Sequence, residues 1–274
     1  MKAADKILTW FIFLFLYAPL LVMMFFSFNE GRSTAVFTGF SLKWYMELFT
    51  NRDTMQALQN TLVLATLSSV IATVLGTMAA VGVFKMKSRV GRSAIMTVTN
   101  IPMMNPDIVT GVSMMLLFVF VGRMLGTANS LSFFTLLIAH ITFNLPYVVL
   151  NILPKLRQTD KHLAEAAMDL GCTPVQAFFK VILPAIRSGV LAGFLMAFTM
   201  SLDDFVISYY TNGADFQTLP LKIFAMTKKT VKPDMYALSS VIFITILILL
   251  ILVNLAQAKA DQQNQQVLGG ISEK

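Results

Sequence analysis

Six long apolar runs constrain what this chain can fold into more than any other feature of its sequence. Hydrophobic residues fill 56% of the 274 positions and charged residues only 13%, which is too little polar surface to cover a soluble globule. A helix crosses a bilayer with about 20 apolar residues, so each run is long enough to span. The runs lie at residues 7–28, 60–84, 94–122, 130–153, 188–210 and 237–256. The sequence therefore predicts an all-α membrane protein of about six transmembrane helices.

The basic residues between these runs predict the topology. Both the loop after the second run, with Lys85 and Arg92, and the loop after the fourth run, with Lys155 and Arg187, are rich in Lys and Arg. The positive-inside rule makes both loops cytoplasmic, and six crossings then place both termini in the cytoplasm. The net charge of +7 is explained by this topology, because the basic residues do not form the aromatic-interleaved patch that nucleic acid needs. We therefore expect this protein to interact with the lipid bilayer and not with nucleic acid.

We expect one transmembrane domain over residues 1–258 and a polar cytoplasmic tail over residues 259–274. About six helices of roughly 20 residues already take up nearly half of the chain, which leaves little for a second folded unit. The first run follows two lysines but is longer than a signal-peptide core and precedes no small-residue cleavage site, so we interpret it as an uncleaved helix. Cys172 is the one cysteine, so neither an internal disulfide nor a multi-thiolate metal site is expected.

The third run is interrupted by two prolines, Pro102 and Pro106, and by the carboxylate of Asp107. A helix break at membrane depth is tolerated only where protein or a water-filled cavity satisfies the freed backbone groups, and such breaks often mark transport paths. The alternative is that a shorter span simply begins at Ile108.

The segment from Asp160 to Pro184 reads as a short helix, a tight turn and a second helix. Leu163, Ala166, Ala167 and Leu170 follow helical spacing and predict one apolar face. Gly171 can end that helix. Thr173, Pro174 and Gln176 then form the pattern of a capping box with proline at the first helical position.

At these residues the chain resembles the permease subunits of ATP-binding-cassette (ABC) importers. Their cytoplasmic signature runs Glu-Ala-Ala, three residues, Gly, nine residues, Ile-x-Leu-Pro, and Val181 stands here at the isoleucine position. The residues that fit the signature are Glu165, Ala166, Ala167, Gly171, Leu183 and Pro184. The resemblance implies the MetI-like permease fold and a coupling loop, residues 155–187, that docks on an ATPase dimer.

The sequence lacks the common motifs for ATP binding and for zinc-dependent hydrolysis. The chain has no G-x-x-x-x-G-K-[ST] sequence, so ATP is expected on the partner ATPase and no cofactor on this chain. It also has no H-E-x-x-H sequence, and His140 reads as a hydrogen-bonded packing residue rather than a metal ligand. We therefore expect a permease subunit without a catalytic site or a metal.

Three carboxylates within the apolar runs, Asp107, Asp203 and Asp204, are candidates for the substrate path. Charged groups in spans cost roughly 2.5–3.5 kcal/mol each to insert, and these would attract a cation. The alternative is that Asp203 and Asp204 hold helices together, through Lys222 or an arginine of a partner.

The wider sequence resembles the spermidine and putrescine importers, specifically the PotC type of permease. The segments that carry this resemblance are MMNPDIV, HITFNLPYV, EAAMDLG, SLDDFVIS and TLPLKIFAM. It implies that this chain lies in the inner cell membrane and that its substrate is a polyamine. It also implies three partners: a second homologous permease, an ATPase dimer and an extracytoplasmic polyamine-binding protein. A permease for another small cation or organic solute, and an ATP-independent channel, stay open as alternatives.

Overall fold

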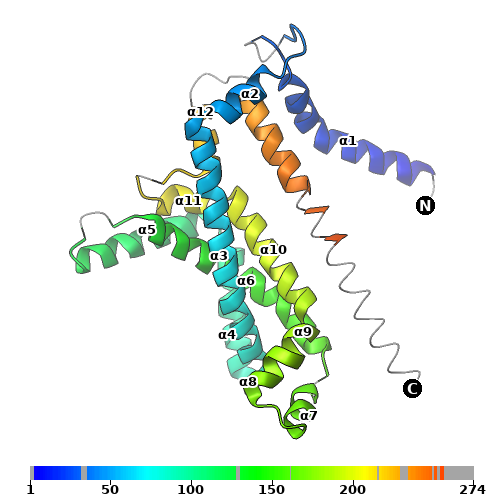
Figure 1. Cartoon of the computed structure of the whole chain (residues 1–274), viewed down its shortest axis with the longest axis vertical. Coiled ribbons are helices and arrows are strands. Elements are labelled where there is room, and N and C mark those ends of the chain that lie inside the picture. The colour runs from blue at the N-terminus through cyan, green and yellow to red at the C-terminus, as the bar shows by residue number, and fades with distance from the viewer. Residues whose placement is uncertain are drawn as a thin grey trace. The chain divides into compact units, whose positions relative to one another are not determined.

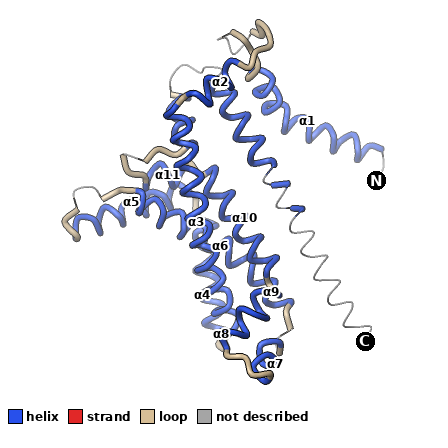
Figure 2. Tube along the Cα trace, viewed as in Figure 1, coloured by secondary structure: helices blue, strands red, loops and turns tan. Residues whose placement is uncertain are grey.

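The computed structural model describes residues 3–31, 36–127, 130–160, 162–214, 216–228, 234–248, 250–251 and 254–255. Within these ranges the chain is built of helices and loops, and the one β-type pairing is an isolated bridge between Asn29 and Phe40 (Figure 2). The predicted all-α class is confirmed. The predicted tail, residues 259–274, lies outside the described residues.

The α-helices of the described residues keep the labels of Figure 1, and the π-helix η1 lies between α8 and α9. The longer helices are α1 (Ala3–Phe26), α3 (Arg52–Lys85), α4 (Arg89–Met104), α5 (Asp107–Met124), α6 (Phe133–Gln158) and α10 (Arg187–Asp203). The shorter elements are α2 (Lys43–Thr50), α7 (Leu163–Asp169), α8 (Pro174–Ala177), the π-helix η1 (Phe178–Ile182), α9 (Leu183–Ala185), α11 (Val206–Thr211) and α12 (Leu219–Thr227). A further apolar helix covers Asp234–Ile248.

Four described helices are long and apolar enough to cross a membrane: Asp5–Phe26, α3, α5 and α6. A fifth crossing is counted if Pro174–Ala185 and α10 form one span, although these two segments meet at 74°. The sixth predicted run corresponds to Asp234–Ile248, which is shorter than a full span within the described residues.

Two predicted spans are broken in the structure. The run at 94–122 is divided into α4 and α5 at Asn105 and Pro106, so the span that starts at Asp107 agrees with the shorter-span alternative. The run at 188–210 was expected to be continuous, but α10 ends at Asp203 and α11 begins at Val206. Pro106 explains the first break because it has no N–H to donate, and the second is stabilised by Asp204, as described below.

The contacts divide the chain into two compact units, Met1–Gln59 with Leu219–Leu249, and Asn60–Thr218 with Leu250–Lys274. The first has a small core of Leu48, Ala57, Leu219 and Leu238. The second holds every predicted site residue and has a larger core centred on Val148 and Ile152 of α6.

Small residues let α6 pack closely in the second unit. A Cβ atom on Gly76 of α3 would lie 2.5 Å from Val148 Cγ1, and one on Gly193 of α10 would lie 3.2 Å from the same atom. Glycine at these positions therefore makes room for Val148 between the helices, as is common where dispersion packing holds membrane helices together.

Candidate functional site: a coupling loop and two broken helices

The turn after α7 is a Schellman motif. Gly171 has φ of +89°, in the left-handed region that glycine enters at little cost. Its N–H donates to the carbonyl of Met168 at 2.9 Å, and the Cys172 N–H donates to the carbonyl of Ala167 at 3.1 Å. These bonds satisfy the last carbonyls of α7. The prediction that Gly171 ends the helix is confirmed.

The restart after the turn is the predicted capping box. The Gln176 N–H donates to Thr173 Oγ1 at 3.3 Å, and the Thr173 N–H donates to Gln176 Oε1 at 3.0 Å. Pro174 occupies the start of α8, where its missing N–H costs nothing. Both ends of the turn are thus fixed by bonds between residues no more than five positions apart.

The segment that follows widens into a π-helix, which the sequence did not predict. The Leu183 N–H donates to the Phe178 carbonyl, five residues back. Pro184 supplies a physical reason, because a proline within an α-helix clashes with the carbonyl four residues earlier, here that of Lys180. The wider turn accommodates the ring, and the chain then bends by 74° into α10.

The predicted apolar face of α7 does not all point into the protein. Ala167 is 7% exposed, and Ala164 packs against the main core. Leu170 is 87% exposed, and Leu163 and Ala166 are exposed as well. The predicted apolar positions are thus divided between the core and the surface, because only one edge of this short helix reaches the core.

Several large apolar side chains of the coupling loop are therefore exposed. Its exposed large residues are Leu163, Met168, Leu170, Val175 and Phe179. Glu165 lies on α7 with Leu163 and Met168, is exposed, and has its Oε2 3.0 Å from His162 Nδ1. This surface is suited to contact another protein, since apolar groups mixed with a few polar ones are typical of docking faces.

The loop is joined to the helical bundle by residues that the signature does not include. Ile182 and Ile186 are buried in the same core as Val148 and Ile152, and Phe178 packs against it. Of the signature residues, Leu183 is half-buried and Pro184 is exposed. The apolar residues on either side of Leu183 and Pro184 are thus the physical link to α3, α6 and α10.

The second part of the site is formed where the two broken helices meet. Helix α11 packs against α5. The contact is close at Gly111, where a Cβ atom would lie 3.0 Å from the Tyr210 ring and 3.4 Å from the Val206 carbonyl oxygen. Asp107 stands at the start of α5 and interacts electrostatically with Asp204, which also interacts with Asp203. Electrostatic interactions thus link the three predicted carboxylates, which stand at the break between α4 and α5 and at the break between α10 and α11.

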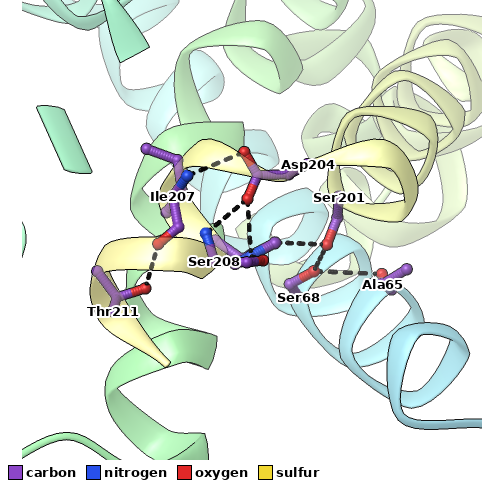
Figure 3. Close-up of polar contacts among 8 residues, drawn as sticks. Ala65, Ser68, Ser201, Asp204, Ile207, Ser208 and Thr211 are labelled. Carbon is purple, nitrogen blue, oxygen red and sulfur yellow. Dashed lines mark hydrogen bonds and ion pairs between the residues drawn. The ribbon is translucent and has the colours of Figure 1, made fainter. Parts of the chain in front are cut away.

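The three carboxylates have different surroundings. Asp204 has a side chain only 8% exposed and accepts hydrogen bonds from the N–H groups of Ile207 at 3.2 Å and Ser208 at 2.7 Å. These bonds cap the start of α11, as Figure 3 shows. Asp107 and Asp203 are exposed. Asp204 thus has the contacts of a structural residue, whereas the other two are accessible.

The fold matches solved transport proteins along almost its whole length. A bacterial ABC transporter involved in the import of the acidic polysaccharide alginate gives a TM-score of 0.71 at 17% identity, covering 96% of this chain and 94% of that one. The MetNI methionine ABC transporter gives a TM-score of 0.54 at 18% identity, covering 81% and 97%. The fold is that of an ABC importer permease, as the coupling loop predicted.

Sequence comparisons give the family. Residues 72–263 match the model of the binding-protein-dependent transport system inner membrane component. The putrescine permease PotI of Escherichia coli K12 is 36% identical over 251 residues, 92% of this chain and 89% of that protein. The spermidine/putrescine permease PotC of Haemophilus influenzae is 37% identical over 248 residues, 90% and 94% respectively. The chain belongs to this family of inner membrane permeases, together with PotI and PotC.

Proposed function

We propose that this chain is a transmembrane subunit of an ATP-driven importer that takes up polyamines such as spermidine and putrescine. The observation that carries the proposal is the similarity to PotI and PotC along about nine tenths of the chain. The partners would be an ATPase dimer, a second homologous permease and an extracytoplasmic polyamine-binding protein. ATP would be bound by the ATPase, and this chain would have no catalytic site.

The coupling loop would be the contact with the ATPase. Its exposed apolar side chains and the accessible Glu165 offer a docking surface, and the Schellman turn and capping box hold that surface in one shape. Ile182, Ile186 and Phe178 lie in one continuous core with α6. A displacement of the loop would therefore move the bundle with it, because packed interiors transmit rather than absorb displacement.

The accessible carboxylates would supply the substrate selectivity. A chain of the same fold belongs to a transporter that imports an acidic polysaccharide, so the fold alone does not determine the charge of the solute. Here Asp107 and Asp203 present negative charge at two helix breaks, and the carbonyl ends of α4 and α10 add a partial negative charge. Such a site attracts an amine that carries positive charge.

Alternating access would connect the two regions. ATP binding would close the ATPase dimer and draw the coupling loop, which we place in the cytoplasm with both termini, toward the dimer axis. The path would then open to the loaded binding protein, and hydrolysis would restore the inward-facing state. Residues 1–258 would act as one transmembrane domain, with lipid or the second permease covering α1, whose spanning segment buries no residue within the chain.

Uptake into vesicles tests the proposal. The chain is purified with its ATPase, second permease and binding protein, reconstituted, and given radiolabelled spermidine or putrescine with or without internal ATP. We expect ATP-dependent accumulation of at least one polyamine, with no accumulation when the binding protein is omitted. ATP-dependent uptake of a different solute alone would refute the substrate assignment, and polyamine entry without ATP would favour the channel alternative.

A further inference from the structure

A chain of buried polar side chains runs through the second unit and ends at Asp204. It contains Ser68 of α3, His140 of α6, Ser201 of α10 and Ser208 of α11, all at most 2% exposed. Ser68 Oγ lies 2.9 Å from Ser201 Oγ (Figure 3). Ser201 Oγ lies 2.7 Å from His140 Nδ1, and Ser208 Oγ lies 3.1 Å from His140 Nε2. Buried polar groups are costly to fold unless each has a hydrogen-bond partner. A fully paired series of this kind therefore suggests that these side chains have a specific function.

One tautomer of His140 satisfies every member of the series. The Ser68 hydroxyl donates to the carbonyl of Ala65 at 3.3 Å, so the Ser68 oxygen accepts from the Ser201 hydroxyl. The Ser201 oxygen then accepts from His140 Nδ1–H, and Nε2 of the neutral ring accepts from the Ser208 hydroxyl. The backbone N–H of Ser208 donates to Asp204 Oδ2 at 2.7 Å and joins the series to the carboxylate.

The imidazole joins the two sides of a helix break. Nδ1 contacts Ser201 in the last turn of α10, and Nε2 contacts Ser208 in the first turn of α11. Asp204 lies between these helices, with Oδ2 3.5 Å from Nε2. A rigid ring on a third helix thus fixes the spacing of the two helix ends that flank Asp203 and Asp204.

We propose that His140 is a positioning residue that sets the geometry of the acidic helix break, and through it the affinity of the open path for an ammonium group. It acts through Ser208 and Asp204 rather than by touching the solute, because it is 1% exposed. The inference about affinity rests on the proposed polyamine function. The inference about the helix break does not.

Three substitutions separate the two contacts of the ring. The amide of glutamine reaches about as far as Nε2 and keeps the bond to Ser208, whereas the shorter amide of asparagine reaches about as far as Nδ1 and keeps the bond to Ser201. Leucine keeps the volume and loses both bonds. His140→Gln is therefore the conservative variant for α11, and His140→Asn is its matched counterpart.

Asn144→Leu is the control for changing a buried polar residue on the same helix. Asn144 lies one turn after His140 and is fully buried, and its side-chain atoms have no hydrogen-bond partner among the described residues. Its replacement removes polarity from α6 without touching the series that ends at Asp204. We expect this variant to keep native uptake kinetics.

The experiment combines amide exchange with uptake kinetics on the intact reconstituted complex. Deuterium exchange is measured for the segment that contains the Ile207 and Ser208 amides, and the apparent KM and kcat are measured for radiolabelled putrescine and spermidine. We expect His140→Asn and His140→Leu to raise exchange in this segment at least tenfold and KM at least fivefold, with kcat within twofold. We expect His140→Gln to remain within twofold of the native protein in all three.

The contrary results are distinct. Two results would overturn the proposal in favour of a general packing role. One is amide exchange that rises as much in α3 and α6 as in α11. The other is an equal change in exchange and KM in the glutamine and asparagine variants. A selective rise in α11 exchange with an unchanged KM would refute the link to affinity. If the native complex takes up no polyamine, the proposed function fails, and the exchange pattern still decides whether His140 holds the break.

Discussion

The coupling loop and the acidic helix break both interrupt helices, but they are held in opposite ways. The loop is fixed by backbone and capping bonds between neighbours, such as Thr173 with Gln176, and leaves an apolar surface exposed. The break is fixed by side chains 61 to 68 residues apart, which converge on the buried ring of His140. The comparison distinguishes a loop that is fixed locally and exposes apolar side chains from a helix break that is fixed by distant side chains around the buried Asp204. Under the proposed function, the loop meets the ATPase and the break holds charge on the substrate path.

The largest expected effect sharpens the loop side of the comparison. Gly171→Val places a β-branched residue at φ of +89°, which costs about 2 kcal/mol because the Cβ meets the backbone. Apart from the backbone of the adjoining residues, a Cβ at this position has no atom within 4 Å, so only the backbone conformation is affected. We expect ATP-driven uptake to fall about thirtyfold while the protein inserts normally, since about 1.4 kcal/mol corresponds to a factor of ten.

Gly171→Asn is the matched control, because asparagine tolerates the left-handed region better than other residues. It should retain most of the uptake. Preserved uptake in the valine variant, with normal amounts of assembled complex, would contradict the role given to this turn.

The next effect concerns the accessible carboxylate at the break. Asp203→Asn removes a charge while keeping the shape, and a charge-assisted contact is typically worth about 1.5–3 kcal/mol. We expect the apparent KM for spermidine to rise about tenfold or more with little change in kcat. An unchanged KM would favour a structural role for Asp203, and uptake titrations in vesicles make this measurement.

Asp204 should respond differently from its neighbour. Asp204→Ala removes the cap of α11 and should lower the free energy of unfolding by about 1 kcal/mol, visible as a lower midpoint of thermal unfolding. Asp204→Asn keeps a capping oxygen and should restore much of this stability. If alanine leaves the midpoint unchanged, the two carboxylates do not have the separate roles inferred here.

The smallest effect returns to the loop. Thr173→Ala removes one side-chain acceptor from the capping box and should cost about 0.5–1 kcal/mol locally, which would lower uptake by about twofold to fivefold. Thr173→Ser keeps the hydroxyl and should behave like the native protein. A larger loss than that of Gly171→Val would reverse the order of importance of the two ends of the turn.

The same contrast explains what the sequence could predict. Gly171 and the pair Thr173 and Gln176 act on residues a few positions away, so their spacing alone predicted the turn. The break after Asp203 was missed because its flanking run contains neither proline nor glycine there, and its cap is provided by Asp204. The visible signal was two adjacent carboxylates within an apolar stretch.

The contacts of His140 were beyond sequence reasoning for a related reason. Its character as a hydrogen-bonded buried residue was predicted, and it is confirmed. Its partners on α10 and α11 were not, because no local pattern relates residue 140 to residues 201 and 208. The π-helix before Pro184 was also missed, although a proline near a helix end is a signal that could have been used.

The ratio of polyamine molecules imported to ATP molecules hydrolysed tests the central claim most directly, when it is measured with subsaturating polyamine in the Gly171→Val and Asp203→Asn complexes. If the coupling loop transmits the ATPase movement and the acidic break binds the solute, ATP hydrolysis stimulated by the binding protein falls together with uptake in Gly171→Val. In the second variant hydrolysis persists, while import per ATP drops and recovers as the polyamine concentration is raised. Identical responses of the two variants would contradict the account.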